Sequence, residues 1–97
     1  MKVLALEIEV AGVRDEQFTA ELLRAEAARA WQLYREGVVR EAYSRADRDM
    51  AVLVLEAAGV EEARRVLATL PLVRAGLISF EVVPLAPYPG FERLFAG

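Results

Sequence analysis

The stretch ATLPLVRAGLISFEVVPLAPY (Ala68–Tyr88) decides how this chain folds. Residues Gly59–Leu70 are predicted to form a helix, and Pro71 cannot continue it, because proline has no amide hydrogen and its ring clashes with the preceding turn. Proline also biases the residue before it, Leu70, away from helical geometry. An apolar strand is then predicted over Leu77–Val83. The stretch therefore ends a helix and returns the chain to a sheet.

More strands and a longer helix are predicted before this stretch. The strand segments alternate or are continuously apolar, while Ala, Leu, Glu and Arg, which favour helices, fill residues 16–36. Asp15 is the predicted N-cap of that helix, and Gly37 is a natural stop. The predicted upstream strands are residues 2–10, Val38–Ala46 and Met50–Ala57.

The order of these elements predicts an α+β fold. Strand, helix, strand, strand, helix, strand is the ferredoxin-like βαββαβ pattern, here in a single domain over residues 1–97. Such a four-stranded antiparallel sheet carries both helices on one face. Met50–Leu55 is apolar on both faces, which predicts that the other face is covered too. Two such sheets packed face to face form a dimeric α/β barrel, so we expect a homodimer or a larger homo-oligomer.

The C-terminal tail is expected to serve that assembly. Prolines keep the segment from Pro84 to Phe95 irregular, but the segment is too apolar to be left in solvent. We therefore predict that it packs on a neighbouring subunit. Its large apolar side chains are Tyr88, Phe91, Leu94 and Phe95.

Composition narrows the chemistry. The 97-residue chain is 56% hydrophobic, has a formal net charge of −3, and contains neither cysteine nor histidine. Disulfides, zinc–thiolate sites and histidine catalysis are excluded, and we predict no bound metal. An acidic balance without a basic stripe argues against nucleic acid as a partner. Glu7 and Glu9 interrupt what would be the apolar part of a signal peptide. No apolar run is long enough to span a membrane. We therefore expect a cytoplasmic protein that does not bind a membrane.

One acid falls on the apolar side of the first helix. At about 100° per residue from Phe18, Glu26 lands at about 80°, inside the arc that holds Leu22 and Leu33. A carboxylate there is costly unless it is paired, protonated or beside a cavity. Glu26 is therefore either structural, through an ion pair or contact with solvent, or a carboxylate whose pKa is raised by desolvation and that suits acid–base catalysis.

Polar side chains also interrupt the outer positions of two strands. We expect Glu7 and Glu9 of the first strand, and Ser79 and Glu81 of the fourth, to share the face without helices, because these strands are neighbours in this fold. There they either line a cavity or simply face solvent. The apolar residues expected to face the helices are Leu4, Leu6 and Ile8, with Ile78, Phe80 and Val82.

The second strand offers groups for a ligand. Arg40, opening onto an apolar cavity, would suit a small carboxylate, and Tyr43 lies nearby on the same strand. The alternative is a surface arginine, and this is the interpretation for Arg45. Trp31 lies outside the apolar arc of the first helix, which predicts a subunit contact.

Two motifs carry a family resemblance. The segments REGVVREAYSRAD (Arg35–Asp47) and VEEARRVLATLPL (Val60–Leu72), with the strand that follows, resemble muconolactone Δ-isomerase and its relatives. The resemblance covers nearly the whole chain, and the LPL closure at the right distance from REG is its most specific part. It implies a ferredoxin-like subunit, a dimeric barrel that often forms larger assemblies, and a cofactor-independent isomerase that moves a proton across an unsaturated lactone.

The resemblance also implies roles for single residues. The family's glutamate on the first helix falls on Glu26, which would be the catalytic proton shuttle, and Arg40 matches the arginine of the second strand, which would hold a substrate carboxylate. With Tyr43, Ser79 and Glu81 it forms the predicted substrate-binding set for a small anionic organic ligand. Two family histidines are replaced by Glu41 and Arg48, which bears on the substrate more than on the fold.

Two other functions stay open at this point. A non-catalytic dimeric barrel that binds a ligand or only assembles predicts a closed interior and a Glu26 neutralised by an arginine. A cofactor-independent monooxygenase of the same architecture would need a large aromatic or histidine-lined cavity, and the chain has few aromatic residues and no histidine.

Overall fold

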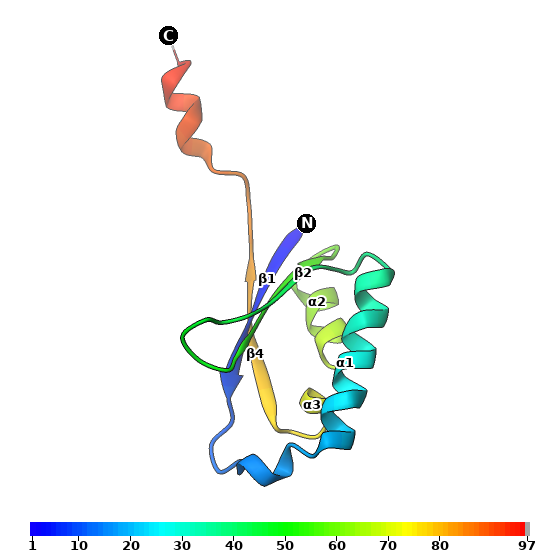
Figure 1. Cartoon of the computed structure of the whole chain (residues 1–97). Coiled ribbons are helices and arrows are strands. Elements are labelled where there is room, and N and C mark those ends of the chain that lie inside the picture. Colours follow the sequence, from blue (N-terminus) through cyan, green and yellow to red (C-terminus); the bar gives the residue numbers. More distant parts are fainter. Residues whose placement is uncertain (97) are drawn as a thin grey trace.

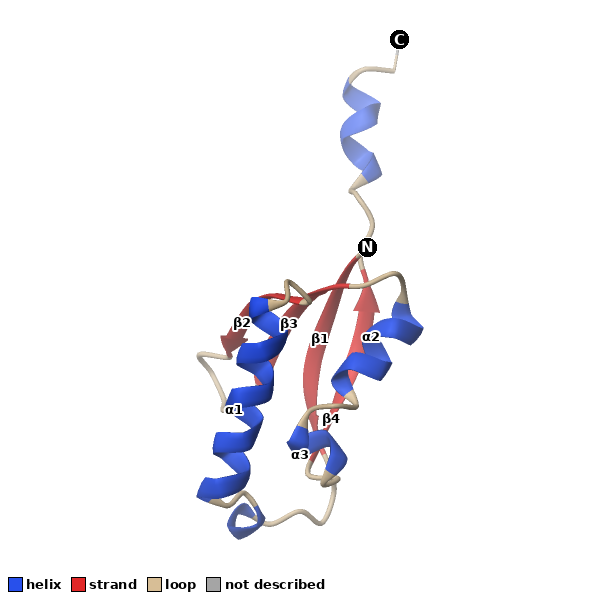
Figure 2. Cartoon of the chain, turned by 90° about the vertical axis from the view of Figure 1, so that its right-hand side faces the viewer, coloured by secondary structure: helices blue, strands red, loops and turns tan. Residues whose placement is uncertain are grey.

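The computed structural model describes residues 1–96 and confirms the predicted ferredoxin-like fold. All strand pairs are antiparallel, in the order β2-β3-β1-β4. Figures 1 and 2 show the helices α1 to α3 together on one face of this sheet. No helix within these residues is long and apolar enough to cross a membrane. The strands are β1 (Lys2–Glu9), β2 (Val39–Ser44), β3 (Ala51–Glu56) and β4 (Ile78–Pro84), the helices are α1 (Ala20–Arg35), α2 (Val60–Leu67) and α3 (Pro71–Arg74), and the 3-10 turns are η1 (Asp15–Gln17) and η2 (Pro89–Leu94).

The first helix begins later than predicted. Asp15 is not its N-cap but the first residue of the turn η1. Thr19 caps α1 instead, and its hydroxyl accepts a hydrogen bond from the backbone N–H of Leu22 at 3.2 Å. Phe18 explains the delay, because it packs against the small apolar cluster beneath α3 and the chain turns to place it there.

The predicted stop at Gly37 is confirmed. Gly37 has φ of +79°, a left-handed conformation that glycine adopts without strain. Its N–H donates to the carbonyl of Tyr34 at 3.1 Å, and the N–H of Val38 donates to the carbonyl of Leu33 at 3.0 Å. These paired bonds satisfy the last carbonyls of α1 and turn the chain toward β2.

The proline stretch does more than end a helix. The second helix ends at Leu67, and Pro71 is the first residue of a further short helix, α3. Proline suits that position because the first N–H of a helix has no partner within the helix. Gly76, with φ of +75°, then ends α3, and the N–H of Leu77 donates to the carbonyl of Leu72 at 3.0 Å. The chain enters β4 from this turn.

The structure reverses the two faces of β1. Val3 and Ala5 have 0% of their surface exposed, whereas Ile8 is 43% exposed. Val3 is paired with Leu55, and Ala5 with Leu53, so the buried face of β1 continues into β3. The prediction that the larger residues of β1 face the helices is therefore wrong. Each fully buried Val or Leu contributes about 1.5–3 kcal/mol relative to an exposed position. The core residues are Val3, Ala5, Leu33, Val39, Leu53, Leu55, Ala57, Ala63, Leu67 and Leu70.

The opposite face of the sheet is also largely apolar. Pairing across the strands places Tyr43, Val52, Leu6 and Glu81 in one row. The next row holds Glu41, Val54, Leu4 and Val83. We call these two rows the open face. Its apolar side chains are only partly buried in the single chain. An apolar face of this kind is typical of a sheet that packs on a partner, which keeps the dimeric barrel as our prediction.

We expect a Val54→Glu variant to fold but to lose self-association. Val54 lies on β3 at the centre of the open face, where an added carboxylate would be buried without a partner in a barrel. Burying such a charge costs several kcal/mol, which weakens a dimer by more than about a hundredfold in Kd. Sedimentation velocity measures the change. Ala28→Glu, on the solvent-facing side of α1, is the matched control, and equal assembly of both variants would contradict the barrel.

The tail contacts little of its own chain. Figure 1 shows residues 85–96 extending away from the body. Phe91, Leu94 and Phe95 are 66%, 76% and 84% exposed. The prediction of an irregular tail is wrong in part, because Pro89–Leu94 forms the 3-10 turns of η2, with Tyr88 packed edge-on against Phe91 at 5.0 Å between ring centroids. Exposed aromatic residues in such a projecting segment favour contact with another subunit.

Deletion of residues 87–97 tests that contact. The shortened chain keeps the hydrogen bond from the Leu85 N–H to the carbonyl of Lys2, so the sheet should retain its far-ultraviolet circular dichroism. We expect its assembly to become smaller or weaker in light scattering. An unchanged assembly would refute the predicted role of the tail.

Candidate active site

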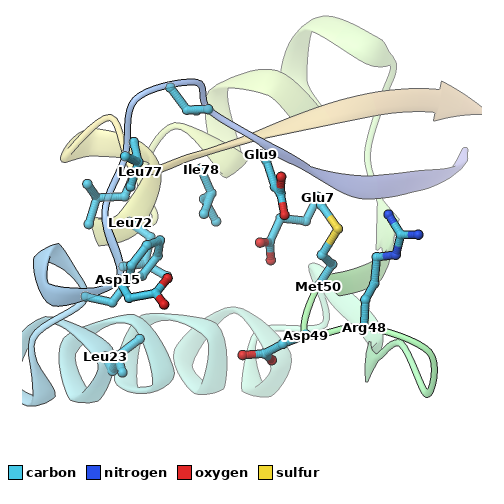
Figure 3. Close-up of a pocket in the computed structure, with 13 residues that line it drawn as sticks. Glu7, Glu9, Asp15, Leu23, Arg48, Asp49, Met50, Leu72, Leu77 and Ile78 are labelled. Atoms are coloured by element: carbon cyan, nitrogen blue, oxygen red, sulfur yellow. The ribbon is translucent and has the colours of Figure 1, made fainter.

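A cavity of about 730 Å³ opens on the helix side of the sheet. It lies where β1 ends, between the first half of α1, the short helix α3 and the β2–β3 hairpin, and Figure 3 shows its side chains pointing into the space between β1 and α1. A volume of this size accommodates a small organic molecule. Its lining residues are Glu7, Glu9, Val10, Val13, Asp15, Phe18, Leu23, Arg48, Asp49, Met50, Leu72, Leu77 and Ile78.

Glu26, on α1, is not a lining residue of this cavity but is hydrogen-bonded to one, Leu72. Its side chain is half-buried, and its Oε1 accepts a hydrogen bond from the backbone N–H of Leu72 at 2.9 Å. Leu72 itself lines the cavity. Burial raises the pKa of Glu26, the Leu72 N–H lowers it in part, and the negative charge of Glu7 raises it further. The result is a desolvated carboxyl with a raised pKa, as the position of Glu26 in the apolar arc predicted.

No arginine neutralises Glu26 in the part of the chain that the structure describes. The ion pairs there join Arg14 to Glu16, Arg45 to Asp47 and the N-terminal amine to Glu56. The ion pair, one form of the structural interpretation of Glu26, is therefore not present among these residues. What holds the carboxylate is a backbone N–H at the start of α3.

Glu7 is the second acid of the site, and sequence reasoning put it on the wrong face. Its neighbours in β1, Ala5 and Val3, point to the helices, and Glu7 continues this side toward the cavity. Its Oε1 accepts a hydrogen bond from the N–H of Ala51 at 2.9 Å. Burial raises the pKa of Glu7, the bond to Ala51 lowers it, and the charges of Asp49 and Glu9 raise it.

Most lining residues of the cavity are apolar, and the charged ones are mainly acidic. The described residues contribute the carboxylates of Glu7, Glu9, Asp15 and Asp49, against the guanidinium of Arg48. The same residues, 1–96, hold no group of three or more His, Cys, Asp or Glu side chains placed to bind a metal ion. What this arrangement can do is exchange protons with a bound molecule through carboxyl groups.

Arg40 lies at the other end of the sheet. It occupies the irregular position between Val39 and Glu41 in the pairing of β2 with β3, and Val39 is paired with Leu55, near the start of β1. The Nε of Arg40 donates to the carbonyl of Gly37 at 2.6 Å. Within one chain, Arg40 therefore does not reach Glu26, and its role as an anion anchor stays a prediction.

The other predicted substrate-binding residues lie on the open face. Tyr43 and Glu81 share one of its rows, Ser79 is paired with Ile8 on the same side, and all three are exposed. The Tyr43 hydroxyl donates to Oε1 of Glu41 at 2.6 Å. The sheet separates these residues from Glu26, so their substrate-binding role also stays a prediction.

The hairpin residues of the cavity were missed by sequence reasoning. Arg48, Asp49 and Met50 follow β2 and border the space beside Glu7. Arg48 takes a position where the family resemblance expects a histidine, and this was the one signal that the hairpin contributes to the site. A hairpin is recognised from residues that are adjacent in the sequence. This pattern does not show that the hairpin lies beside the distant end of β1.

The family model of muconolactone delta-isomerase matches residues 3–90. The chain belongs to the muconolactone delta-isomerase family. The resemblance carried by the REG and LPL segments is thereby confirmed, and both segments lie inside the matched range. A search of curated protein sequences gave no significant match.

Solved structures share the fold of this family member. A crystal structure of muconolactone isomerase at 3.3 Å resolution superposes with a TM-score of 0.71, at 24% identity over 92% of each chain. A 5-chloro-2-hydroxyhydroquinone dehydrochlorinase from Burkholderia phenoliruptrix, solved with 2,5-dihydroxybenzoquinone, gives a TM-score of 0.65 at 19% identity, over 89% of this chain and 94% of that one. At these identities the likeness establishes the fold. Family membership supports an isomerase-like enzyme.

The raised pKa values of Glu7 and Glu26 predict a pH dependence of stability. Both values lie above the ordinary 4.5, so the folded state holds these protons more tightly than the unfolded state does. Their contribution favours the folded state below pH 4.5 and is lost as the pH rises through the raised values. Urea unfolding from pH 4 to pH 8 should show this loss in the wild type and not in a Glu7→Gln, Glu26→Gln double variant. Parallel curves for the two proteins would contradict the prediction.

Proposed function

We propose that this chain is a cofactor-independent isomerase that shifts a proton on a small unsaturated lactone or carboxylate, with Glu26 as the group that transfers the proton. The observation that supports this most is the half-buried Glu26 carboxyl beside the cavity, with its pKa raised by burial. Its family supplies the reaction class.

The environment of Glu26 suits a group that must both take and return a proton. A free glutamate is a weak base at neutral pH, and raising its pKa brings it closer to the working pH. The N–H of Leu72 holds one oxygen of the carboxylate at 2.9 Å and orients the group. A positioned carboxyl with a raised pKa can therefore alternate between its two protonation states during one turnover.

The proposed reaction is an isomerisation without oxidation or reduction, in which one proton passes from the substrate to Glu26 and back. The Glu26 carboxylate removes a proton from the saturated carbon next to the conjugated system, and the electron pair of that C–H bond spreads into a dienolate. The protonated Glu26 then gives the proton to the far carbon of the same system, and the double bond changes position. The enzyme ends in its starting state.

The other predicted binding residues do not reach Glu26 within one chain. We keep Arg40, Tyr43, Ser79 and Glu81 as predicted binding residues for a small anionic organic ligand. On the helix side, Arg48 is the basic group in the lining of the cavity among the described residues. The rest of that lining consists of apolar side chains and four carboxylates, which favours an uncharged reacting end of the substrate, with any substrate carboxylate directed toward Arg48 at the hairpin.

A non-catalytic assembly protein is the second candidate, and one observation favours it. The bond from Leu72 gives Glu26 a structural task, because the carboxylate satisfies an N–H at the start of α3. If that bond were the whole role of Glu26, the wild-type protein would have no isomerase activity for a Glu26 variant to lose.

Glu26→Gln tests the proposal. Glutamine keeps an oxygen that can accept the Leu72 N–H, so the variant should fold, but it cannot carry the proton. We expect kcat on muconolactone or a related unsaturated lactone to fall by about 10²–10⁴-fold, the usual contribution of a general acid–base group. Ultraviolet absorbance or proton NMR measures the turnover, and circular dichroism checks the fold.

Glu21→Gln is the matched control on the same helix. Glu21 lies in the first turn of α1 and is exposed, so its removal should leave turnover unchanged. Full activity in Glu26→Gln, or no activity of the wild type on any small unsaturated lactone or carboxylate, would sink the proposed function.

A further inference from the structure

Two aromatic residues form an exposed platform near the end of α1. The rings of Trp31 and Tyr34 stack, with 5.6 Å between their centroids and 18° between their planes, and the two residues are 60% and 50% exposed. A cavity of about 290 Å³ lies beside Trp31, lined also by Gln32, Arg35 and Glu36. We call the platform and this cavity the α1 patch. An exposed aromatic surface of this kind is typical of a contact between proteins.

The tail carries a second aromatic cluster, and its shape is set in advance. Tyr88 has φ of −68° and ψ of 117°, close to polyproline II, a geometry that its neighbours Pro87 and Pro89 favour. The Tyr88 ring meets Phe91 edge-on and lies over Gly90, where the Cβ of any other residue would overlap it. Proline-rich segments of this form dock on aromatic surfaces with little loss of conformational freedom.

Charge distinguishes the α1 patch from the cavity beside Glu7 as a place for the tail. The tail carries one acid and one base, Glu92 and Arg93. The cavity has four carboxylates in its lining, which would repel Glu92 and would lose water if aromatic rings entered. The α1 patch offers one group of each sign, Arg35 and Glu36, and neither belongs to an ion pair within residues 1–96. The α1 patch therefore complements the tail.

The exposed area indicates that two such contacts form together. Aromatic side chains bury about 150–250 Å² each, so the exposed rings of one patch and one tail present roughly 600 Å². A single contact of this size is below the range of stable interfaces, whereas two reciprocal contacts reach its lower limit of about 1,200 Å². A two-fold exchange of tails supplies the second contact. The rings are those of Trp31, Tyr34, Tyr88, Phe91 and Phe95.

The tail and the α1 patch lie at the same end of the molecule. Figures 1 and 2 show the tail leaving the body at the end where α1 finishes, and Trp31 and Tyr34 belong to that part of the helix. Two copies that approach through these ends can each lay a tail along α1 of the other. The outer side of α1 is not used when two sheets pack through their open faces, so the exchange is compatible with the predicted barrel.

We propose that two copies of this chain exchange their tails at this end, with Tyr88 and Phe91 of each copy packed on Trp31 and Tyr34 of the other. The proposal gives the predicted contact of the tail a definite acceptor surface. It is independent of the chemistry at Glu26. Together with the barrel interface, the exchange produces an assembly larger than a dimer.

Trp31 is the only tryptophan of the chain, so its fluorescence reports on the α1 patch alone. Acrylamide quenching is measured on the whole protein from dilute monomer to concentrated assembly, with light scattering to follow size. We expect quenching to decrease and the emission to shift to shorter wavelength as the wild type assembles. Phe91→Ala should lose both changes. Leu23→Ala, which shortens another exposed apolar side chain of α1, is the control and should keep them.

Four results of this measurement would overturn the proposal. Quenching that stays the same on assembly shows that the α1 patch is not an interface. Equal protection of Trp31 in Phe91→Ala shows that another surface covers it. Full protection in the dilute monomer shows that the tail of the same chain covers it. A wild type that does not assemble leaves no second copy to exchange with.

A double-mutant cycle tests whether the two clusters contact each other. Trp31→Ala and Phe91→Ala each remove an exposed ring, so circular dichroism should show an intact fold. We expect each variant to weaken the tail-dependent association by about 30-fold in Kd, as the loss of a central interface aromatic residue does. The double variant should be scarcely weaker than either single one in sedimentation equilibrium, because the same contact is lost. Effects that multiply would show separate partners and overturn the exchange.

Discussion

Leu72 has a backbone N–H that its own helix cannot satisfy, and the Glu26 carboxylate on α1 accepts it at 2.9 Å. The need arises from the sequence, because Pro71 begins α3 and makes Leu72 its second residue, where an N–H has no partner in the helix. Leu72 is buried, so water is a poor substitute. The bond ties α1 to α3 and draws a carboxylate out of solvent. That burial raises the pKa of Glu26, although the bond from the Leu72 N–H itself lowers it in part.

The sheet explains why sequence reasoning found Glu26 but misplaced Glu7. Helical periodicity has one apolar arc, so an acid inside it stands out. Strand alternation gives two faces, and in β1 both are apolar over the first residues, which leaves their assignment open. Size was a poor guide, because the helices pack over the small residues Val3 and Ala5, while the larger Leu4 and Leu6 lie on the open face. Choosing the larger residues for the core moved Glu7 to the wrong side.

Much of the fold was readable because local chemistry fixes it. Gly37 ends α1 in the left-handed conformation that glycine tolerates, and the strand and helix order determines the ferredoxin-like topology. The errors fall where distant contacts decide. Asp15 has the right chemistry for an N-cap, yet packing of Phe18 delays the helix to Thr19. The cavity likewise depends on a hairpin lying beside the end of β1, which no local pattern contains.

The sheet also sets a limit on how one site can be built. Glu7 and Glu26 lie on its helix side, whereas Tyr43 and Glu81 lie on its open face. Packing two sheets face to face encloses the open faces and leaves each cavity outside the barrel, so dimerisation alone cannot bring the two sets onto one small ligand. Only a segment that passes around the edge of the sheet can join them. The proposed proton transfer on the helix side therefore relies on groups of that side, among them the carboxyls of Glu26 and Glu7 and the guanidinium of Arg48 in the hairpin.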